Sequence, residues 1–477
     1  MNSKQTISQW MENNQSVFTE MAKEIWENPQ IAYEEQFASE LQMSALKEEG
    51  FAIQTPVGDS PTAFVAEYGS GKPIIGILGE YDALPGLSQT VSTTHDEVVP
   101  GGPGHGCGHN LLGTAGVEAA FALKNIMDSE ELKGTIRYYG CPAEEVLSGK
   151  TFMAREGVFD DLDCALTWHP GTSNMAVNLS MQAMVSVKFH FKGTTAHAAG
   201  APHAGRSALD AVELMNVGAN YLREHVLDGS RIHYVITNGG LAPNVVPDDA
   251  SVWYYLRAAT KDQVEDMLQR VEKIAEGASL MTETQVDSEI LAFAYETLPN
   301  EALNDAMYEN MNELGLEPFT PDEQSFAQAL VDTVDSKVVE MSKKMFGKPI
   351  DEMLPTSVEN DKSLFGKTMG GSSDIGDVSW ITPMGQVMTT CAPVGVQVHS
   401  WQATASFGSS IGFKGMHLAA KTMAWTALDL LENEELLEKA KKEFAEKTKG
   451  KPYVPGIPEN VKPDGAERVK DPVVMTS

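Results

Sequence analysis

Hydrophobic positions in the first 50 residues recur roughly every three to four residues, which is the spacing of one face of an amphipathic helix. Trp10, Phe18 and Ile25 follow this spacing. Short apolar runs then alternate with helical stretches. Strands are predicted at 73–79, 135–140 and 164–168, and a helix at 110–127 with Asn110 as its N-cap. This alternation predicts an α/β domain built on a mostly parallel central sheet, flanked by helices and buried on both faces.

The pattern changes near residue 184, where VSVKFHFKG (185–193) alternates between apolar and polar residues as a half-exposed strand does. A helical run, two more strands and an amphipathic helix follow at 207–225, 232–240, 251–260 and 262–281. Strand–helix units of this kind predict an α+β, ferredoxin-like domain inserted into the larger one. The predicted division is therefore 1–183 and 299–477 for the two parts of the larger domain, and 184–298 for the insert.

Charge narrows the class of protein. The 477 residues include 35 Lys and Arg against 67 Asp and Glu, a formal net charge of -32. Such a surface repels phosphate backbones and anionic lipid, so we expect binding neither to nucleic acid nor to a membrane. No stretch approaches the ~20 apolar residues of a membrane-spanning helix. The N-terminus lacks the pattern of a signal peptide, and four cysteines are too few for a disulfide framework, so we expect a cytoplasmic protein.

Polar clusters follow several predicted strands directly. Glu80-Tyr81-Asp82 follows the first strand, Glu144-Glu145 the second and His169 the third, while TTCAPVG (389–395) leads to His399. A loop with the sequence HGCGH (105–109) precedes the helix at 110. Functional groups gather at the carboxyl ends of strands in open α/β sheets. We therefore expect these clusters to converge on one edge of the sheet.

The converging residues form a ligand set suited to divalent zinc, manganese or cobalt. The glycines of HGCGH allow Cys107 and His109 to face one ion, and one glutamate of the pair could bind metal while the other handles protons. Each feature alone also has an ordinary explanation. A His/Cys pair in a loop can be coincidental, adjacent glutamates are commonly solvated, and His169 could be a core histidine. Their combination favours a metal centre.

Other catalytic classes lack their signatures in this sequence. There is no G-x-S-x-G elbow for a serine hydrolase, no Walker-type phosphate loop, and no G-x-G-x-x-G that opens a helix after a first strand. A papain-like pairing of Cys107 with a histidine remains open, although the glutamates would then have no role.

Several motifs together resemble a known family. They are GEYDALPGLSQ (79–89), GHGCGHNLLGTA (104–115), YGCPAEE (139–145), TWHP (167–170), TTAHAAGAPHAGRSALDAV (194–212), NVVP (244–247) and DIGDVSW (374–380). The chain resembles, nearly end to end, the metal-dependent amidohydrolases of the aminoacylase and carboxypeptidase superfamily. Within it, the chain is most similar to the branch that includes indole-acetyl-amino-acid hydrolases and p-aminobenzoyl-glutamate hydrolase.

This resemblance implies two divalent metal ions per subunit (Mn²⁺, Zn²⁺ or Co²⁺) in the larger domain. It assigns Glu144 as general base and later acid, and Asp82 as the residue that orients a ligand. The implied ligands are Cys107, which bridges the ions, together with His109, Glu145, His169 and His399. The sequence departs from the wider superfamily at Glu80, where many relatives have a metal-binding histidine, and at Asn110, where indole-acetyl hydrolases usually have Asp. These departures leave the number and identity of the metal ions open.

The inserted domain, by the same resemblance, is a lid that also dimerises, in a homodimer or in a heterodimer with a related subunit. His197 resembles the histidine that reaches the partner's site and stabilises the oxyanion. Asn244 and Arg257 resemble residues that bind the substrate carboxylate, although Arg257 could equally form an ion pair on the lid surface.

The resemblance implies hydrolysis of the amide bond of N-acyl or N-aroyl amino acids, with p-aminobenzoyl-glutamate as the named candidate. Two alternatives stay open: a dipeptidase or aminoacylase for a different acyl group, and a non-catalytic partner subunit of a heteromeric hydrolase. A metal-stabilised scaffold without turnover is a further possibility. The presence of Glu144 together with all five ligand candidates argues against the last two.

Overall fold

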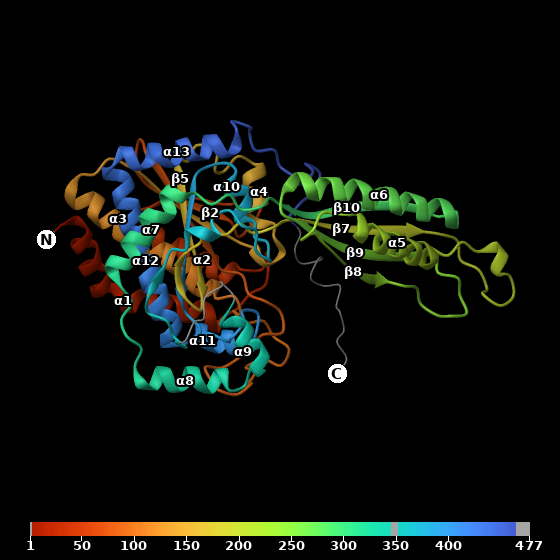
Figure 1. The fold of residues 1–477 in the computed structure, drawn as a ribbon, viewed down its shortest axis with the longest axis horizontal. Coiled ribbons are helices and arrows are strands. Elements are labelled where there is room, and N and C mark those ends of the chain that lie inside the picture. Colours follow the sequence, from red (N-terminus) through yellow and green to blue (C-terminus); the bar gives the residue numbers. More distant parts are fainter. Residues whose placement is uncertain (1, 345–351, 464–477) are drawn as a thin grey trace.

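The computed structural model describes residues 2–344 and 352–463 (Figure 1). A large α/β unit contains residues 2–182 and the described residues after 294. A smaller unit, coloured yellow to green, extends from one side of it. Each unit has its own hydrophobic core.

The large unit is built on an eight-stranded sheet of order β1-β2-β4-β3-β5-β12-β6-β11. Its four central neighbours β4, β3, β5 and β12 are parallel, while β1 and β2 add antiparallel strands at one edge. The predicted α/β class with a mostly parallel sheet is therefore confirmed. The strands are β1 (Ala52–Gln54), β2 (Phe64–Ser70), β3 (Ile74–Glu80), β4 (Gly134–Cys141), β5 (Cys164–Gly171), β6 (Asn174–Ala176), β11 (Val358–Glu359) and β12 (Met384–Thr390).

Both faces of this sheet are covered. Alternate residues of β3 enter different cores: Ile77 packs with the helices of one face, and Leu78 packs with the opposite cluster around Phe159. An apolar run without alternation, such as IIGILG, suits a strand that is buried on both sides. The helices of this unit are α1 (Ser3–Glu27), α2 (Gln36–Glu48), α3 (His109–Glu130), α4 (Gly149–Arg155), α7 (Glu301–Leu314), α8 (Pro321–Val331), α9 (Ser336–Ser342), α10 (Ile375–Ser379), α11 (Trp401–Phe407), α12 (Ser410–Glu432) and α13 (Glu434–Thr448).

Helix α3 begins earlier than the sequence predicted. Gly108, with φ +80°, is its N-cap, so the prediction that Asn110 caps the helix is wrong. The amide of Asn110 is buried in the first turn and donates to the carbonyl oxygens of Ala22 and Phe407. A glycine is needed at 108 because the backbone is left-handed there and a Cβ would lie 2.9 Å from the Pro170 ring.

The smaller unit contains a four-stranded antiparallel sheet of order β10-β7-β9-β8. In chain order its elements follow the ferredoxin-like pattern of two strand–helix–strand units. They are β7 (Ala183–Lys192), α5 (Ala208–Leu222), β8 (Arg231–Asn238), β9 (Asp249–Ala258), α6 (Lys261–Thr282) and β10 (Gln285–Ala294). These elements fall within the predicted insert apart from one residue of β7. The domain boundaries at 183/184 and 298/299 stay sequence predictions.

Both helices of the smaller unit pack on one face of its sheet. Val252, Tyr254 and Leu256 of β9 point into the core shared with α5 and α6. The intervening residues of β9, Trp253, Tyr255 and Arg257, point to the opposite face of the sheet, away from α5 and α6. Among the residues that the structure describes, no helix has the length and apolar character needed to cross a membrane.

Candidate active site

The predicted clusters meet at the carboxyl ends of the four central parallel strands. Glu80 ends β3, Glu144 and Glu145 follow β4, and His169 lies near the end of β5. The segment after β12 brings in His399, whose N–H donates to the Gly106 carbonyl oxygen at 2.8 Å. Parallel strands direct these segments to one edge of the sheet, as the sequence analysis expected.

Two buried carboxylates hold the turn that carries the glutamate pair. Ala143 has a left-handed φ of +56°, and its N–H donates to Glu35 Oε1 at 2.9 Å. The N–H of Glu145 donates to Asp82 Oδ2, also at 2.9 Å. Since both carboxylates are buried, these hydrogen bonds fix the backbone on either side of Glu144 and set the direction of its side chain.

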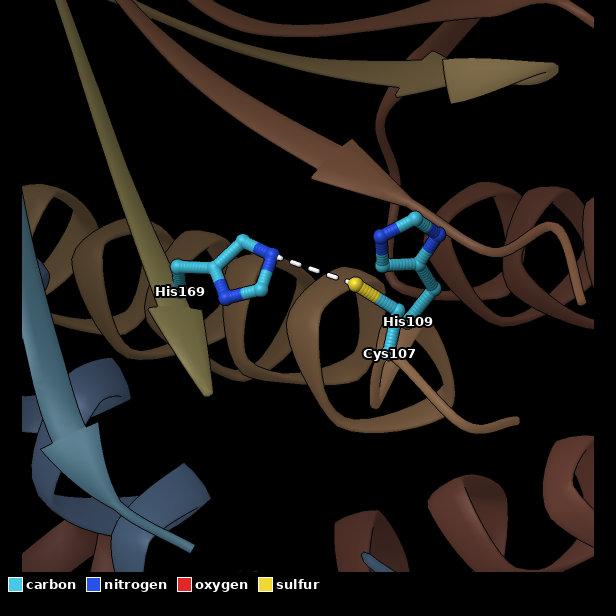
Figure 2. Close-up of side chains that lie close together, drawn as sticks. All are labelled: Cys107, His109 and His169. Atoms are coloured by element: carbon cyan, nitrogen blue, oxygen red, sulfur yellow. Dashed lines mark hydrogen bonds between the residues drawn. The ribbon is translucent and has the colours of Figure 1, made fainter. Parts of the chain in front are cut away.

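Cys107, His109 and His169 point toward one another from the loop before α3, the start of α3 and the end of β5 (Figure 2). Cys107 Sγ lies 3.5 Å from His169 Nε2. The other ring nitrogen of His169, Nδ1, donates to the Pro170 carbonyl oxygen at 2.7 Å. This hydrogen bond leaves Nε2 with a lone pair directed at the cluster, as a metal ligand requires.

Asp82 orients His109 from behind. His109 Nδ1 lies 2.9 Å from Asp82 Oδ1 and 3.1 Å from the Asp82 carbonyl oxygen, so Nδ1 carries the proton and Nε2 faces the cluster. Within the described residues, His109 Nε2 and Glu145 Oε1 are buried atoms without a hydrogen-bond partner. Buried polar atoms are normally paired, so these orphaned atoms indicate a group that the protein atoms do not supply.

Cys107 is shared between two sets of potential metal ligands. It forms one set with His109 and His169 and another with Glu145 and His399, and within each set one ligand atom from each residue lies within 4.8 Å of the others. A third set combines Glu80 and His109 with Glu144. Two three-donor sets of Cys, His and carboxylate groups that share Cys107 would suit divalent ions such as zinc, manganese or cobalt.

Burial shifts the proton affinities of these groups. It raises the pKa of Glu144 well above its ordinary value, and the neighbouring charges of Glu80 and Glu145 raise it further. Burial also raises the pKa of Glu145 to about 7 and lowers the pKa of His399 to about 4. His399 is therefore neutral at physiological pH, which is the form that binds a metal ion.

A buried lysine lies behind the cluster. Lys150 Nζ is 2.7 Å from Glu80 Oε1 and also contacts Asp374 Oδ1, and all three side chains are almost completely buried. Glu80 Oε2 in turn lies 3.3 Å from His109 Nε2. Glu80 is therefore placed between the lysine and the cluster, at the position where the sequence analysis noted the missing histidine.

The three lid residues predicted to contact substrate do not lie together. His197 and Asn244 are in loops at the far end of the small sheet, where the Ala198 N–H donates to the Asn244 carbonyl oxygen. Both side chains are exposed. Arg257 lies at the opposite end of the sheet, and its Nη1 donates to Ser372 Oγ of the large unit at 3.1 Å. Within a single chain, therefore, only Arg257 is near the large unit.

Sequence reasoning missed Glu35, Lys150 and Asp374 as parts of this centre. Asp374 begins DIGDVSW (374–380), a segment whose likeness to the family was noted, but a single charged residue is commonly solvated, and the same holds for Lys150. The sequence did not show that these side chains are buried, and their burial is what identifies them as parts of the centre. The alternation of RIHYVITN (231–238) was visible and could have placed Arg231 and His233 on one face of a strand.

Comparisons with known proteins agree with this geometry. A family model described as a peptidase dimerisation domain matches residues 180–280. One p-aminobenzoyl-glutamate hydrolase subunit of Escherichia coli (strain K12) is 43% identical over 473 residues, covering 96% of this chain and 98% of the relative. The Xaa-Arg dipeptidase of Mus musculus is 31% identical over 443 residues, covering 89% and 88% respectively.

Solved structures share the fold at lower sequence identity. An aminobenzoyl-glutamate utilization protein from Klebsiella pneumoniae superposes with a TM-score of 0.59 at 16% identity, covering 89% of this chain and 98% of that one. A dinuclear metal-binding peptidase of the M20 family from Bacillus subtilis gives 0.56 at 18% identity, covering 88% and 99%.

Proposed function

Since the chain belongs to the M20 family of metal-dependent amidohydrolases and peptidases, we propose that it hydrolyses p-aminobenzoyl-glutamate to p-aminobenzoate and glutamate. The observation that carries this proposal is the cluster of two potential metal-ligand sets around Cys107 beside the buried carboxyl group of Glu144. The high identity to a p-aminobenzoyl-glutamate hydrolase chain supports the choice of substrate.

The residues present fit two divalent ions, which we propose to be Mn²⁺, Zn²⁺ or Co²⁺. Cys107, His109 and His169 would hold one ion, and Cys107, Glu145 and His399 the other. When bound, such ions polarise an amide carbonyl and lower the pKa of a water molecule toward neutrality. Asp82 keeps His109 in the tautomer that binds metal, through its hydrogen bond to Nδ1.

Glu144 is the proposed general base and acid. Its carboxylate takes a proton from the attacking water and then delivers it to the amide nitrogen that leaves. The hydrogen bonds to the N–H groups on both sides of it keep the carboxylate in position, which is necessary for efficient proton transfer.

We further propose that the lid domain forms a dimer and completes the site. His197 and Asn244 would reach the partner's metal centre from the far end of the lid. There, His197 would donate a hydrogen bond to the oxyanion, and Asn244 would bind the carboxylate of the substrate. Exposed apolar side chains on α5 and β8 support a lid–lid interface, whether in a homodimer or with a related subunit. They are Leu214, Val217, Tyr221, Tyr234, Val235 and Ile236.

A second candidate function is a dipeptidase, because the mouse Xaa-Arg dipeptidase matches over nearly the whole chain. The same metal centre and Glu144 could hydrolyse a peptide bond equally well. The two functions therefore differ in the part of the substrate that binds beside the lid. The third hypothesis, a non-catalytic partner subunit, is less favoured because every proposed ligand and Glu144 lie in the cluster.

The test is hydrolysis of p-aminobenzoyl-glutamate by the purified chain, stripped of metal and then given Mn²⁺ or Zn²⁺. We expect release of p-aminobenzoate that depends on the metal, and a decrease in kcat of roughly 10²–10⁴-fold in Glu144→Gln. Glu131→Gln, at an exposed glutamate after α3, is the matched control and should retain activity. Turnover of Xaa-Arg dipeptides alone would favour the dipeptidase, and no turnover by a metal-loaded sample would favour the hypothesis of a partner subunit.

A further inference from the structure

The open face of the lid sheet carries two arginines side by side. Arg257 of β9 is the cross-strand partner of Arg231 of β8, so the two side chains point to the same side of the sheet. This face lies opposite α5 and α6, because the buried residues of β9 point the other way. His233 and Tyr255 form the next cross-strand pair along the same face.

A loop of the large unit covers this end of the face and creates a cleft of about 760 Å³. Residues 368–371 form one wall, and both arginines, His233 and Tyr255 line the other. The loop is held in place because the Gln182 N–H donates to the Gly371 carbonyl oxygen and the Met369 N–H to that of Ser180. A volume of this size is within the range of small-molecule sites.

The two guanidinium groups lack acidic partners. Within the described residues, no Asp or Glu oxygen lies within the 4.0 Å of a salt bridge from Arg231 or Arg257, although the chain has 67 acidic residues. By contrast, Arg137 pairs with both Glu67 and Asp161. Like charges directly opposite each other on neighbouring strands are destabilising, so this arginine pair without a counter-charge points to an anionic ligand.

The pKa shifts around the cleft reflect burial and, for His233, neighbouring arginine charges. Partial burial and the charges of Arg257, Arg223 and Arg231 lower the pKa of His233. Burial also lowers the pKa of Arg257. The single carboxylate among the lining residues is that of Asp228, which is exposed in the turn before β8.

The cleft is connected to the metal centre through one short segment. Ser372, which accepts from Arg257, is two residues before Asp374. Asp374 contacts Lys150, and Lys150 contacts Glu80 beside the metal-ligand cluster. A group bound in the cleft therefore lies against the same loop that supports the centre.

We propose that Arg231 holds the side-chain carboxylate of a dicarboxylic leaving amino acid in this cleft, beside Arg257, which the family resemblance already assigns to the carboxylate common to all N-acyl amino acids. The inference rests on the proposed amidohydrolase function and adds to it the residue that selects a second carboxylate. Two adjacent guanidinium groups suit two carboxylates and repel a cationic side chain. An Xaa-Arg substrate would place a third guanidinium in this cleft.

The experiment compares p-aminobenzoyl-glutamate with p-aminobenzoyl-glutamine, which has the same shape but lacks the second charge. We expect the wild-type enzyme to prefer the glutamate compound in kcat/KM by about 10- to 100-fold, as for one charged hydrogen bond. Arg231→Met should reduce this preference to within about 3-fold by lowering kcat/KM for the glutamate compound alone. Arg270→Met is the matched control, because Arg270 lies on α6 on the other face of the sheet.

An unchanged substrate preference in Arg231→Met would overturn the inference while leaving the proposed function intact. If the enzyme cleaves neither compound, the proposed function fails, and binding then decides the inference separately. In that case glutarate should raise the melting temperature of the wild-type protein and of Arg270→Met but not that of Arg231→Met. Equal shifts in all three proteins, or no shift in any, would refute a dicarboxylate site.

Discussion

Replacing Lys150 by methionine tests whether the buried charge network behind the metal-ligand cluster stabilises the fold. Lys150, Glu80 and Asp374 are all but inaccessible to water, so one positive charge compensates two buried carboxylates. Lys150→Met leaves both carboxylates without a counter-charge. Removing one partner of a buried ion pair costs about 3–5 kcal/mol, and we expect a loss of that size in the free energy of unfolding.

A second substitution distinguishes the loss of charge from the loss of packing at Lys150. Asp374→Asn added to Lys150→Met removes one of the uncompensated carboxylates and returns the network to its original net charge. An asparagine oxygen can still accept the hydrogen bond from the backbone N–H of residue 150. We therefore expect the double variant to be more stable than Lys150→Met by about 2 kcal/mol, which is a favourable coupling between neighbouring sites.

The assay is urea unfolding of the metal-free protein, followed by tryptophan fluorescence, because bound metal would add its own stabilisation. Lys133→Met, at an exposed lysine, is the control and should unfold like the wild type. A Lys150→Met protein within about 0.5 kcal/mol of the control would refute the argument. So would a double variant that is less stable than Lys150→Met.

Three further predictions address the metal-ligand cluster, the buried residue Glu296 and the lid. Cys107→Ala should lower bound metal from about two ions per chain to about none, whereas His169→Ala should retain about one, as measured by elemental analysis. Glu296 is buried and its pKa is raised to about 7 from 4.5, so its contribution to stability is complete below pH 4.5 and is lost as the pH rises through about 7. The wild type should therefore lose up to about 3 kcal/mol between pH 4.5 and 8 relative to Glu296→Gln, in unfolding experiments across that range. Val217→Glu combined with Tyr221→Glu places charges on the exposed apolar side of α5 and should convert the proposed lid–lid dimer to monomers in sedimentation experiments.

Each of these predictions has a clear contrary result. Equal metal loss in the cysteine and histidine variants would mean that the thiolate is not shared between two ions. Parallel pH profiles would show that Glu296 keeps an ordinary pKa in the fold. Val17→Glu is the control for the lid variant, since Val17 is an exposed valine of α1, and dissociation in that control would implicate a different interface.

The sequence predicted the scaffold of the centre well. A continuous apolar run such as IIGILG indicates a strand that is buried on both faces. This signal is contained in the run itself, so the sequence alone can identify such strands of a parallel sheet. The polar residues directly after these runs then had to meet at one edge, because parallel strands share a direction. Cys107 and His109 could be added because the glycines between and around them signalled a tight loop.

Other features were outside the reach of local patterns. Asn110 looked like a helix cap, but the left-handed backbone at Gly108 starts the helix before it. Glu35 is about a hundred residues from Ala143 in the sequence, and only folding makes its carboxylate the acceptor for that N–H. Asn244 and Arg257 were both expected to bind the substrate carboxylate, yet the length of the small sheet separates them.

The sequence by itself determined the α/β scaffold, the order of the strands along the chain and the identity of the potential metal ligands, because these depend on side-chain type and spacing. Only the tertiary structure decided that Cys107 is common to two ligand sets and that Lys150 is buried beside Glu80. The same holds for Arg231, which faces the cleft with Arg257 because two strands pair in one register. Distances and burial between residues far apart in the chain arise from packing, and no local pattern contains them.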